Sequence, residues 1–461
     1  MGSGLGAPSR EASLPLFVQN SPLWLLTEGL EVERFFMAII DLDSPVFSHL
    51  LAPALPLIEH CKFSRRCPEI SDARWLALGI ARSLERHPSG RSFLQCLASH
   101  ADSLCPENSN FFEALKSTRR LALCRELNAQ LADQLRLSLP DGLCAFPCLD
   151  SYDVHVGDGH WHSHACHDAR DDKGAHLGVG HLYTRNLRSG AVSHLDLSDQ
   201  IQRKKEHDMR GLKRQSADTL RHGAAKGRKV LLVWDRAGID FAQWFKWKHS
   251  SGLYLLSRCK ENMSLMVCGQ LAFDRRDPLN AGVLADELVS PSSVGITLRR
   301  VRFWDASQER SFEFITNLID SSVPPGVLAH LYRMRWDIEK TFDLFKNKFG
   351  EIKAWACSAT AKQQQAAFLT LAHNLILLME HQLATQQGVH NRAEEARRSK
   401  RLEKLKFASR KANLVVPLAV KLTQRCTQTS VKFIRWVAVH LWKTISLQRA
   451  CVALTALYAR L

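Results

Sequence analysis

The spacing of hydrophobic and polar positions changes along the chain and divides it into helical and extended regions. From about Ser71 to Gln134, apolar residues recur every three or four positions, as in DARWLALGIARSLERH, and this spacing predicts amphipathic helices. The segment LPDGLCAFPC, which ends at Cys148, is rich in turn residues and marks a boundary. We therefore expect a helical N-terminal region over residues 1–148.

Strands are predicted after this boundary. YDVHVGD alternates as a short strand does, and LGVGHLYTRNLRSGAVSHLDL predicts a hairpin that turns at Ser189-Gly190. A long basic segment, QIQRKKEHDMRGLKRQSADTLRHGAAKGR, predicts a helix, and KVLLVWD predicts a buried strand ending in Asp235. Three strands, a helix and a further strand indicate a mixed α/β domain.

Helical periodicity disappears again between Ser257 and Phe312. Alternating segments such as GITLRRVRFW, separated by Gly, Pro and Ser, predict a β-rich insertion over residues 257–312. FEFITNLI then predicts another buried strand. Pro324-Pro325 begins a long helix that continues through GVLAHLYRMRWDIEKTFDLFKNKF, and helical texture extends to the C-terminus.

Charge adds a candidate partner to this outline. The 461 residues carry a formal net charge of +16. Residues 392–461 hold 16 Lys or Arg against 3 Asp or Glu, so +13 of the +16 lies in the last 70 residues. Such a concentration favours nucleic acid over the alternatives, a solvated or a lipid-facing helical surface. We expect the basic helical region 379–461 to bind DNA, to form a dimer, or both.

Cysteine usage and hydropathy point to the cytoplasm. Thirteen cysteines are scattered without a CxxC pair, which favours reduced thiols over a disulfide framework. The N-terminus lacks the basic and apolar segments of a signal peptide. The longest apolar run, AAFLTLAHNLILLM, is too short to span a bilayer. We expect a cytoplasmic protein with no membrane contact.

One stretch, DGHWHSHACHDARDD, has the density of a metal site. Its fifteen residues, Asp158 to Asp172, include four histidines, one cysteine and four aspartates. Histidine and cysteine favour zinc, whereas aspartate favours magnesium or manganese. The zinc hypothesis would use a Cys-x₃-Cys pair and the alternating histidines, in a spacing that matches no common zinc module: Cys144, Cys148, His160, His162, His164, Cys166 and His167. The stretch alone leaves both metals open.

The helix after Pro325 carries the more specific signal. At about 100° per residue, Arg335, Glu339 and Lys346 fall within about 60° of Tyr332. An apolar stripe lies beside them, formed by Leu331, Ile338, Phe342, Phe345 and Phe349. The purely structural interpretation is an exposed Arg335–Glu339 ion pair that stabilises the helix by a few tenths of a kcal/mol, and it gives no role to Tyr332. Phosphate recognition beside a metal-binding carboxylate explains all four residues.

The segment YRMRWDIEKTFDLFK contains the pattern Y-(2)-R-(3)-E-(6)-K and resembles the DDE transposases of insertion-sequence family four. The resemblance extends from about Ser151 to Leu378. It implies a ribonuclease-H-like catalytic core over residues 149–256 and 313–378, interrupted by the β-rich insertion. It also implies a bacterial cut-and-paste enzyme that cleaves the ends of its own element and joins the 3′ hydroxyl to target DNA.

The family's three carboxylates map onto Asp158, Asp235 and Glu339. In the family these residues bind two catalytic Mg²⁺ ions, for which Mn²⁺ can substitute, and the same roles are implied here. Asp153, near the start of the first strand, is a competing choice for the first carboxylate. If the three carboxylates bind magnesium, structural zinc is not expected. His160 and His162 then become accessory residues, with an effect on DNA or metal affinity.

The resemblance further implies double-stranded DNA as partner, opening of the ends by a DNA hairpin, and a homodimer in the synaptic complex. Residues expected to contact DNA are the phosphate-binding Tyr332, Arg335 and Lys346, a base-stacking Trp304 in the insertion, and Lys116, Arg119 and Arg120 in the N-terminal region. For Trp304 the alternative is packing in the β core, and for the N-terminal basic residues it is an ordinary exposed helix face. A catalytically inactive descendant that only binds DNA is the other functional alternative.

Overall fold

The computed structural model describes residues 42–65, 69–162, 179–198, 206–292, 295–306, 308–351, 353–411 and 431–460. Helices form the N-terminal part: α2 (Pro45–Leu51), α3 (Leu55–His60), α4 (Asp72–Leu84), α5 (Gly90–His100), α6 (Asn108–Leu115) and α7 (Thr118–Ser138). Serine hydroxyls cap several of them, for example Ser71 on α4 and Ser117 on α7, each accepting a hydrogen bond from the backbone N–H three residues later. The residues before 42 lie outside the described part.

A single nine-stranded sheet forms the centre of the molecule, in the order β3-β2-β1-β4-β5-β9-β8-β7-β6. Its first part contains β1 (Tyr152–His162), β2 (Val179–Asn186), β3 (Val192–Ser198), β4 (Lys229–Val233) and β5 (Leu253–Arg258). β1, β2 and β3 are antiparallel neighbours, whereas β4 and β5 run parallel to β1. This order and direction are those of a ribonuclease-H-like core, as the sequence predicts, and the chain is a mixed α/β protein.

Alternate residues of the central strands enter two different cores. Leu231 and Val233 of β4 pack with the helices of one face, among them α13 and α12, while Val230 and Leu232 pack on the other face. The second face is covered by α8 (Asp208–Arg214), α9 (Ala217–Leu220) and α10 (Phe241–Ser251). A strand buried on both faces has no polar side, which is why β4 is apolar without a break after its exposed first residue, Lys229.

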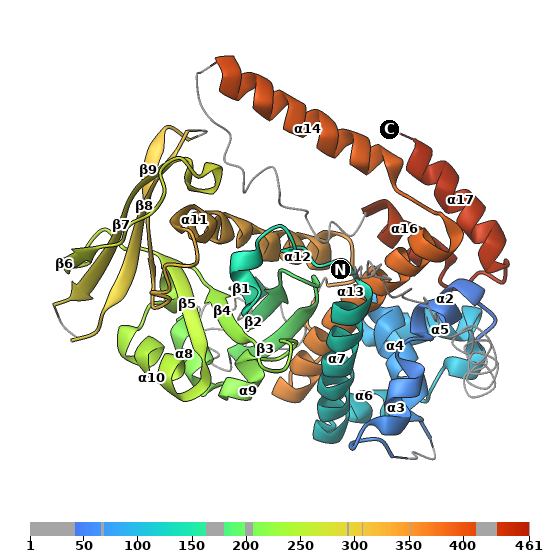
Figure 1. Ribbon diagram of the computed structural model, residues 1–461. Helices are drawn as coiled ribbons and strands as arrows, with labels where there is room; N and C mark the ends of the chain where they lie inside the picture. Colours follow the sequence, from blue (N-terminus) through green and yellow to red (C-terminus); the bar gives the residue numbers. More distant parts are fainter. Residues whose placement is uncertain are drawn as a thin grey trace, which may run out of the picture.

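Residues 265–316 extend this sheet as an antiparallel ribbon that projects from the core (Figure 1). Its strands are β6 (Leu265–Gln270), β7 (Val283–Pro291), β8 (Leu298–Asp305) and β9 (Arg310–Thr316). β9 joins the ribbon to the core because it pairs antiparallel with β5, with Leu256 opposite Thr316. A buried, bidentate Arg299–Asp286 pair holds β8 to β7 at 2.7–2.8 Å.

Two helices that the sequence predicts as continuous are divided. The segment after Pro324 forms α11 (Pro325–Met334) and α12 (Trp336–Asn347), with Arg335 between them. Here the backbone makes i→i+3 hydrogen bonds, from Arg335 to Tyr332 and from Ile338 to Arg335, each 3.1 Å long, which tighten the turn. The prediction of one long helix for the basic segment is also wrong. Its described part forms two short helices, α8 and α9, and the Ser216 side chain caps the N-terminus of α9.

A central helix, α13 (Ala359–Gln387), ties the N-terminal helices to the sheet. Its Asn374 side chain donates to Asn128 of α7 and to the carbonyl of Val192 on β3. The C-terminal part contains α14 (Arg392–Lys411), α16 (Val431–His440) and α17 (Leu447–Ala459), and α14 extends along the outside of the molecule (Figure 1). None of the helices described has the length and apolar character needed to cross a membrane.

Candidate active site

Two of the predicted carboxylates lie side by side because their strands are parallel neighbours. Val156 of β1 is in register with Val233 of β4. Two residues further along the chain in each case are Asp158 and Asp235, so both acids come to the same edge of the sheet. Asp235 closely follows the buried end of β4, and its carboxylate accepts a hydrogen bond of 2.8 Å from the backbone of Ala237.

A third carboxylate, from Asp208, joins them. One oxygen from each of Asp158, Asp208 and Asp235 lies within 4.8 Å of the other two, a separation that suits a shared cation. Asp208 is the first residue of α8 and is only 4% exposed. Sequence reasoning missed it because it is one acid within a strongly basic segment. Its position at the start of the helix after the third strand was the available signal.

Trp234 packs between the two strand ends and leaves room for no side chain at position 157. A Cβ added to Gly157 would lie 2.0 Å from the indole ring, and one added to Gly238 would lie 2.7 Å from the Cβ of the same residue. The indole N–H donates to Asp208 at 3.2 Å. The ring therefore fixes the spacing between the strand residues next to Asp158 and Asp235, and it orients Asp208.

Arg335 brings the third predicted carboxylate to the same place. Its guanidinium donates to Asp158 Oδ2 at 2.5 Å and to Glu339 Oε1 at 2.8 Å. The Arg335–Glu339 ion pair of the purely structural interpretation is thus present. The same arginine also binds Asp158 on β1, 177 positions away in the sequence. One guanidinium holds the carboxylates of β1 and α12 together, and Glu339 reaches the cluster through it.

The electrostatics of this cluster favour a cation. Burial raises the pKa of Asp158 to about 6; the positive charge of Arg335 opposes this change, and the carboxylates of Asp235 and Asp208 add to it. Burial on its own would lower the pKa of Arg335, but Asp158, Tyr332 and Glu339 outweigh it and raise that pKa. Arg335 thus pairs with two of the acids, Asp158 and Glu339, while Asp208 and Asp235 lie close to Asp158. Carboxylate oxygens are the ligands that Mg²⁺ and Mn²⁺ prefer, so these residues fit a divalent cation.

The other residues of the Y-R-E-K pattern lie at different distances from this cluster. Tyr332 is half-buried, and its ring centroid is 5.9 Å from the Arg335 guanidinium carbon. Burial raises the pKa of its hydroxyl. Lys346 is exposed and follows Glu339 by seven residues, about 10 Å along α12. Trp304 on β8 is 41% exposed, so it is not enclosed in the β core.

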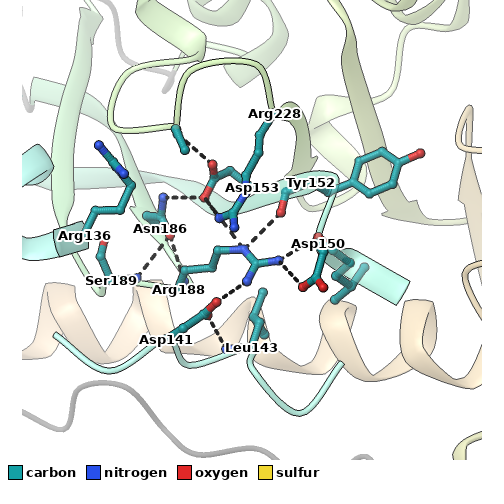
Figure 2. Close-up of polar contacts among 12 residues, drawn as sticks. Arg136, Asp141, Leu143, Asp150, Tyr152, Asp153, Asn186, Arg188, Ser189 and Arg228 are labelled. Carbon is teal, nitrogen blue, oxygen red and sulfur yellow. Dashed lines mark hydrogen bonds and ion pairs between the residues drawn. The ribbon is translucent and has the colours of Figure 1, made fainter. Parts of the chain in front are cut away.

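Asp153, the competing first carboxylate, lies elsewhere (Figure 2). It is fully buried and pairs with Val230, near the opposite end of β4 from Asp235. Its oxygens accept hydrogen bonds from the Ala225 backbone at 2.8 Å and from Asn186 at 3.4 Å, and they lie within 3.9 Å of Arg188 and Arg228. Arg188 in turn donates to Asp141 and to two backbone carbonyls. Asp153 therefore belongs to a buried ion-pair network.

Of the three N-terminal basic residues, Arg119 and Arg120 make contacts inside the protein, whereas Lys116 lies on its surface. Arg119 makes a bidentate pair with Asp72 at 2.8–2.9 Å, and Arg120 is 4% exposed with its guanidinium over the Trp75 ring. Both cations stabilise contacts between α7 and α4, so their guanidinium groups are not presented to DNA in this structure. Lys116 is exposed and pairs with Glu113 on the protein surface.

The histidine-rich stretch is partly described. His160 is buried on β1, and its Nε2 is 2.8 Å from Glu351 Oε2. His162 ends β1, and the remaining histidines and Cys166 lie outside the described residues. Of the two cysteines in the zinc hypothesis, Cys144 is exposed and Cys148 is half-buried. The described part of the stretch thus contributes Asp158 to the acidic cluster and His160 to the core.

Comparison with known proteins connects this geometry to a protein family. Residues 149–375 match the family described as Transposase DDE domain, and this segment contains all four clustered acids. No curated protein matches. Among solved structures, a piggyBac transposase synaptic complex with hairpin DNA is 10% identical, with a TM-score of 0.33, and the alignment covers 93% of this chain and 85% of that chain. Similarity at that level does not bear on function, whereas the family match supports a DNA transposase.

Proposed function

We propose that this protein is a DNA transposase in which Asp158, Asp235 and Glu339 form the catalytic carboxylate set. The observation that carries the proposal is their approach from three separate elements: strand β1, the end of the adjacent strand β4, and helix α12, which is linked through Arg335. Oxygens of Asp158 and Asp235 lie within 4.8 Å of each other, and Arg335 links Glu339 to Asp158. All three acids lie inside the segment that matches the transposase DDE domain family. A structural ion pair between Arg335 and Glu339 would not require Asp208 and Asp235 to lie within 4.8 Å of Asp158.

The chemistry proposed is phosphoryl transfer on DNA. Two Mg²⁺ ions bound by Asp158, Asp235 and Glu339 would polarise the phosphate and activate the attacking and leaving oxygens. The protein's side chains then contribute position and charge: β1 and the end of β4 fix two carboxylates, and Arg335 keeps the third within reach. Tyr332 on α11 and Lys346 on α12 can donate to phosphate oxygens of the DNA.

The finer assignment rests on the resemblance of YRMRWDIEKTFDLFK to insertion-sequence family four. We propose that the enzyme binds the terminal inverted repeats of its own element, opens them through a hairpin, and acts as a homodimer. The basic face of α14 supports DNA contact by the C-terminal region; its described exposed cations are Arg392, Arg397, Lys400, Lys404 and Arg410. Trp304 and Lys116 remain proposed DNA contacts, and Arg119 and Arg120 are omitted because they are paired internally.

Cleavage of DNA that carries the element's terminal repeats, with Mg²⁺ or Mn²⁺, tests this function. Asp235→Ala and Glu339→Ala should abolish cleavage while leaving DNA binding measurable. Asp343→Ala is the matched control, since this acid is exposed on α12 one turn after Glu339 and bonds only to Asn347 among the described contacts. Cleavage that survives both active-site substitutions would refute the assignment. DNA binding by the wild type without any cleavage would favour the inactive descendant.

A further inference from the structure

The buried His160–Glu351 pair has no part in the proposed chemistry, yet it lies next to the active site. The two side chains are 1% and 3% exposed, and Nε2 and Oε2 are 2.8 Å apart. Replacing a buried ionisable pair by apolar residues of similar size is often neutral or stabilising, so such a pair is weak evidence for stability. Its geometry, by contrast, is directional, and it joins two parts of the active site that must stay in register.

On one side the pair belongs to the strand that carries Asp158. His160 is two residues after Asp158, so both side chains point to the same face of β1. The His160 ring packs on Phe342 of α12, with centroids 4.7 Å apart. Phe342 follows Glu339 by three residues and is therefore its neighbour on the helix surface. The His160–Phe342 contact therefore lies beside the place where Arg335 links Asp158 of β1 to Glu339 of α12.

On the other side the pair is held by the chain that leaves α12. Glu351 follows Gly350, whose N–H donates to the carbonyl of Ser83 at 2.6 Å. A Cβ at Gly350 would lie 2.0 Å from the carbonyl oxygen of Glu85, so this backbone is pressed against the end of α4. A second link between the sheet and α12 is the Arg185–Thr341 hydrogen bond of 2.7 Å. The end of α12 is thus fixed to both the N-terminal helices and β1.

We propose that His160 and Glu351 are positioning residues that anchor α12 against β1 and thereby hold Glu339 at the cation site. The role assigned to Glu339 rests on the proposed function, whereas the anchoring of α12 does not. His160 keeps its place in the core through Phe342 and Tyr183, and its hydrogen bond to Glu351 holds the chain just after α12 against β1. Loss of the hydrogen bond should loosen α12 without unfolding the domain.

A double variant, His160→Phe with Glu351→Leu, keeps the ring contact and fills the space but removes the hydrogen bond. We expect its melting temperature to stay near that of the wild type, its affinity for Mn²⁺ to fall about tenfold, and hydrogen exchange within α12 to become faster. Glu351→Gln, which can still hydrogen-bond to His160, should retain the affinity. The control replaces a partly buried pair between two strands of the insertion, Glu287→Leu with Arg300→Met, and should change neither quantity.

Unchanged Mn²⁺ affinity and unchanged exchange of α12 in the first double variant would overturn the proposal. So would an equal loss of Mn²⁺ affinity in the insertion control. If the first double variant fails to fold, Thr341→Val removes the milder second link and should weaken Mn²⁺ binding and speed exchange of α12 in the same directions; no change there would also refute it. Exchange is measured without metal or DNA, so it decides the anchoring role even if the wild type does not cleave DNA.

Discussion

Asp158 should destabilise the metal-free protein at neutral pH, so replacing it by asparagine should stabilise the fold. Burial, with the nearby Asp235 and Asp208, raises the pKa of this carboxyl from 3.8 to about 6 despite the pairing with Arg335. A change of that size corresponds to about 3 kcal/mol between the two protonation states. The Asp158 side chain is 16% exposed, so solvent screens this effect only in part.

The direction of the pH dependence follows from the two pKa values. The folded protein binds the proton more tightly than the unfolded chain between pH 3.8 and about pH 6. The contribution of Asp158 to stability therefore falls as pH rises through this window, and it stays unfavourable above it. An asparagine side chain at this position resembles the protonated acid at every pH. Asp158→Asn should thus raise the free energy of unfolding by up to about 3 kcal/mol at pH 8, and by little near pH 4.

Urea denaturation with a chelator, at pH 8 and pH 4, measures the difference. Excess Mn²⁺ at pH 8 should reverse the order, because the wild type gains stability by binding the ion and the variant does not. Asp343→Asn on the exposed side of α12 is the control and should show neither effect. A variant that is less stable than the wild type at pH 8 with chelator would refute the reasoning, and so would a gain of the same size at pH 4.

Three further substitutions test the surroundings of the site. Asp208→Asn should weaken Mn²⁺ binding and lower the pKa of Asp158, since it removes a negative charge that raises that pKa; a titration of Mn²⁺ affinity against pH would show both effects. Gly157→Ala should cost about 1–3 kcal/mol in unfolding free energy because its Cβ meets Trp234, and adding Trp234→Phe should recover part of the loss. Asp153→Ala should destabilise by about 1–3 kcal/mol because it removes the acceptor of the Ala225 backbone N–H and of the Asn186 amide. Any Asp153 variant that folds should bind Mn²⁺ normally, and lost Mn²⁺ binding would make Asp153 the first carboxylate.

Local pattern was enough to predict most of the sheet. KVLLVWD and the hairpin around Ser189-Gly190 form strands as expected, because a buried strand must be apolar and a hairpin turn needs glycine at positive φ, here +76° at Gly190. The apolar stripe on the helix after Pro325 is likewise buried. Local pattern did not show the break at Arg335, because helical spacing continues across it and the i→i+3 hydrogen bonds depend on how α11 and α12 pack.

The amino-acid sequence by itself determined where the first strands lie and which helical segment carries the Y-R-E-K pattern, since both depend on periodicity and on residue type. It did not determine the ends of the strands: β1 continues past Asp158 to His162, and β4 ends at Val233, before Asp235. Tertiary structure decided which acids meet. Asp158 and Asp153 are the same residue type on the same strand. The register of β1 with β4 nevertheless places Asp158 beside Asp235 and Asp153 near Arg188. Contacts between residues far apart in the chain place Asp208 in the cluster, bury Arg120 and His160, and pair Arg119 with Asp72, and no local spacing records such contacts.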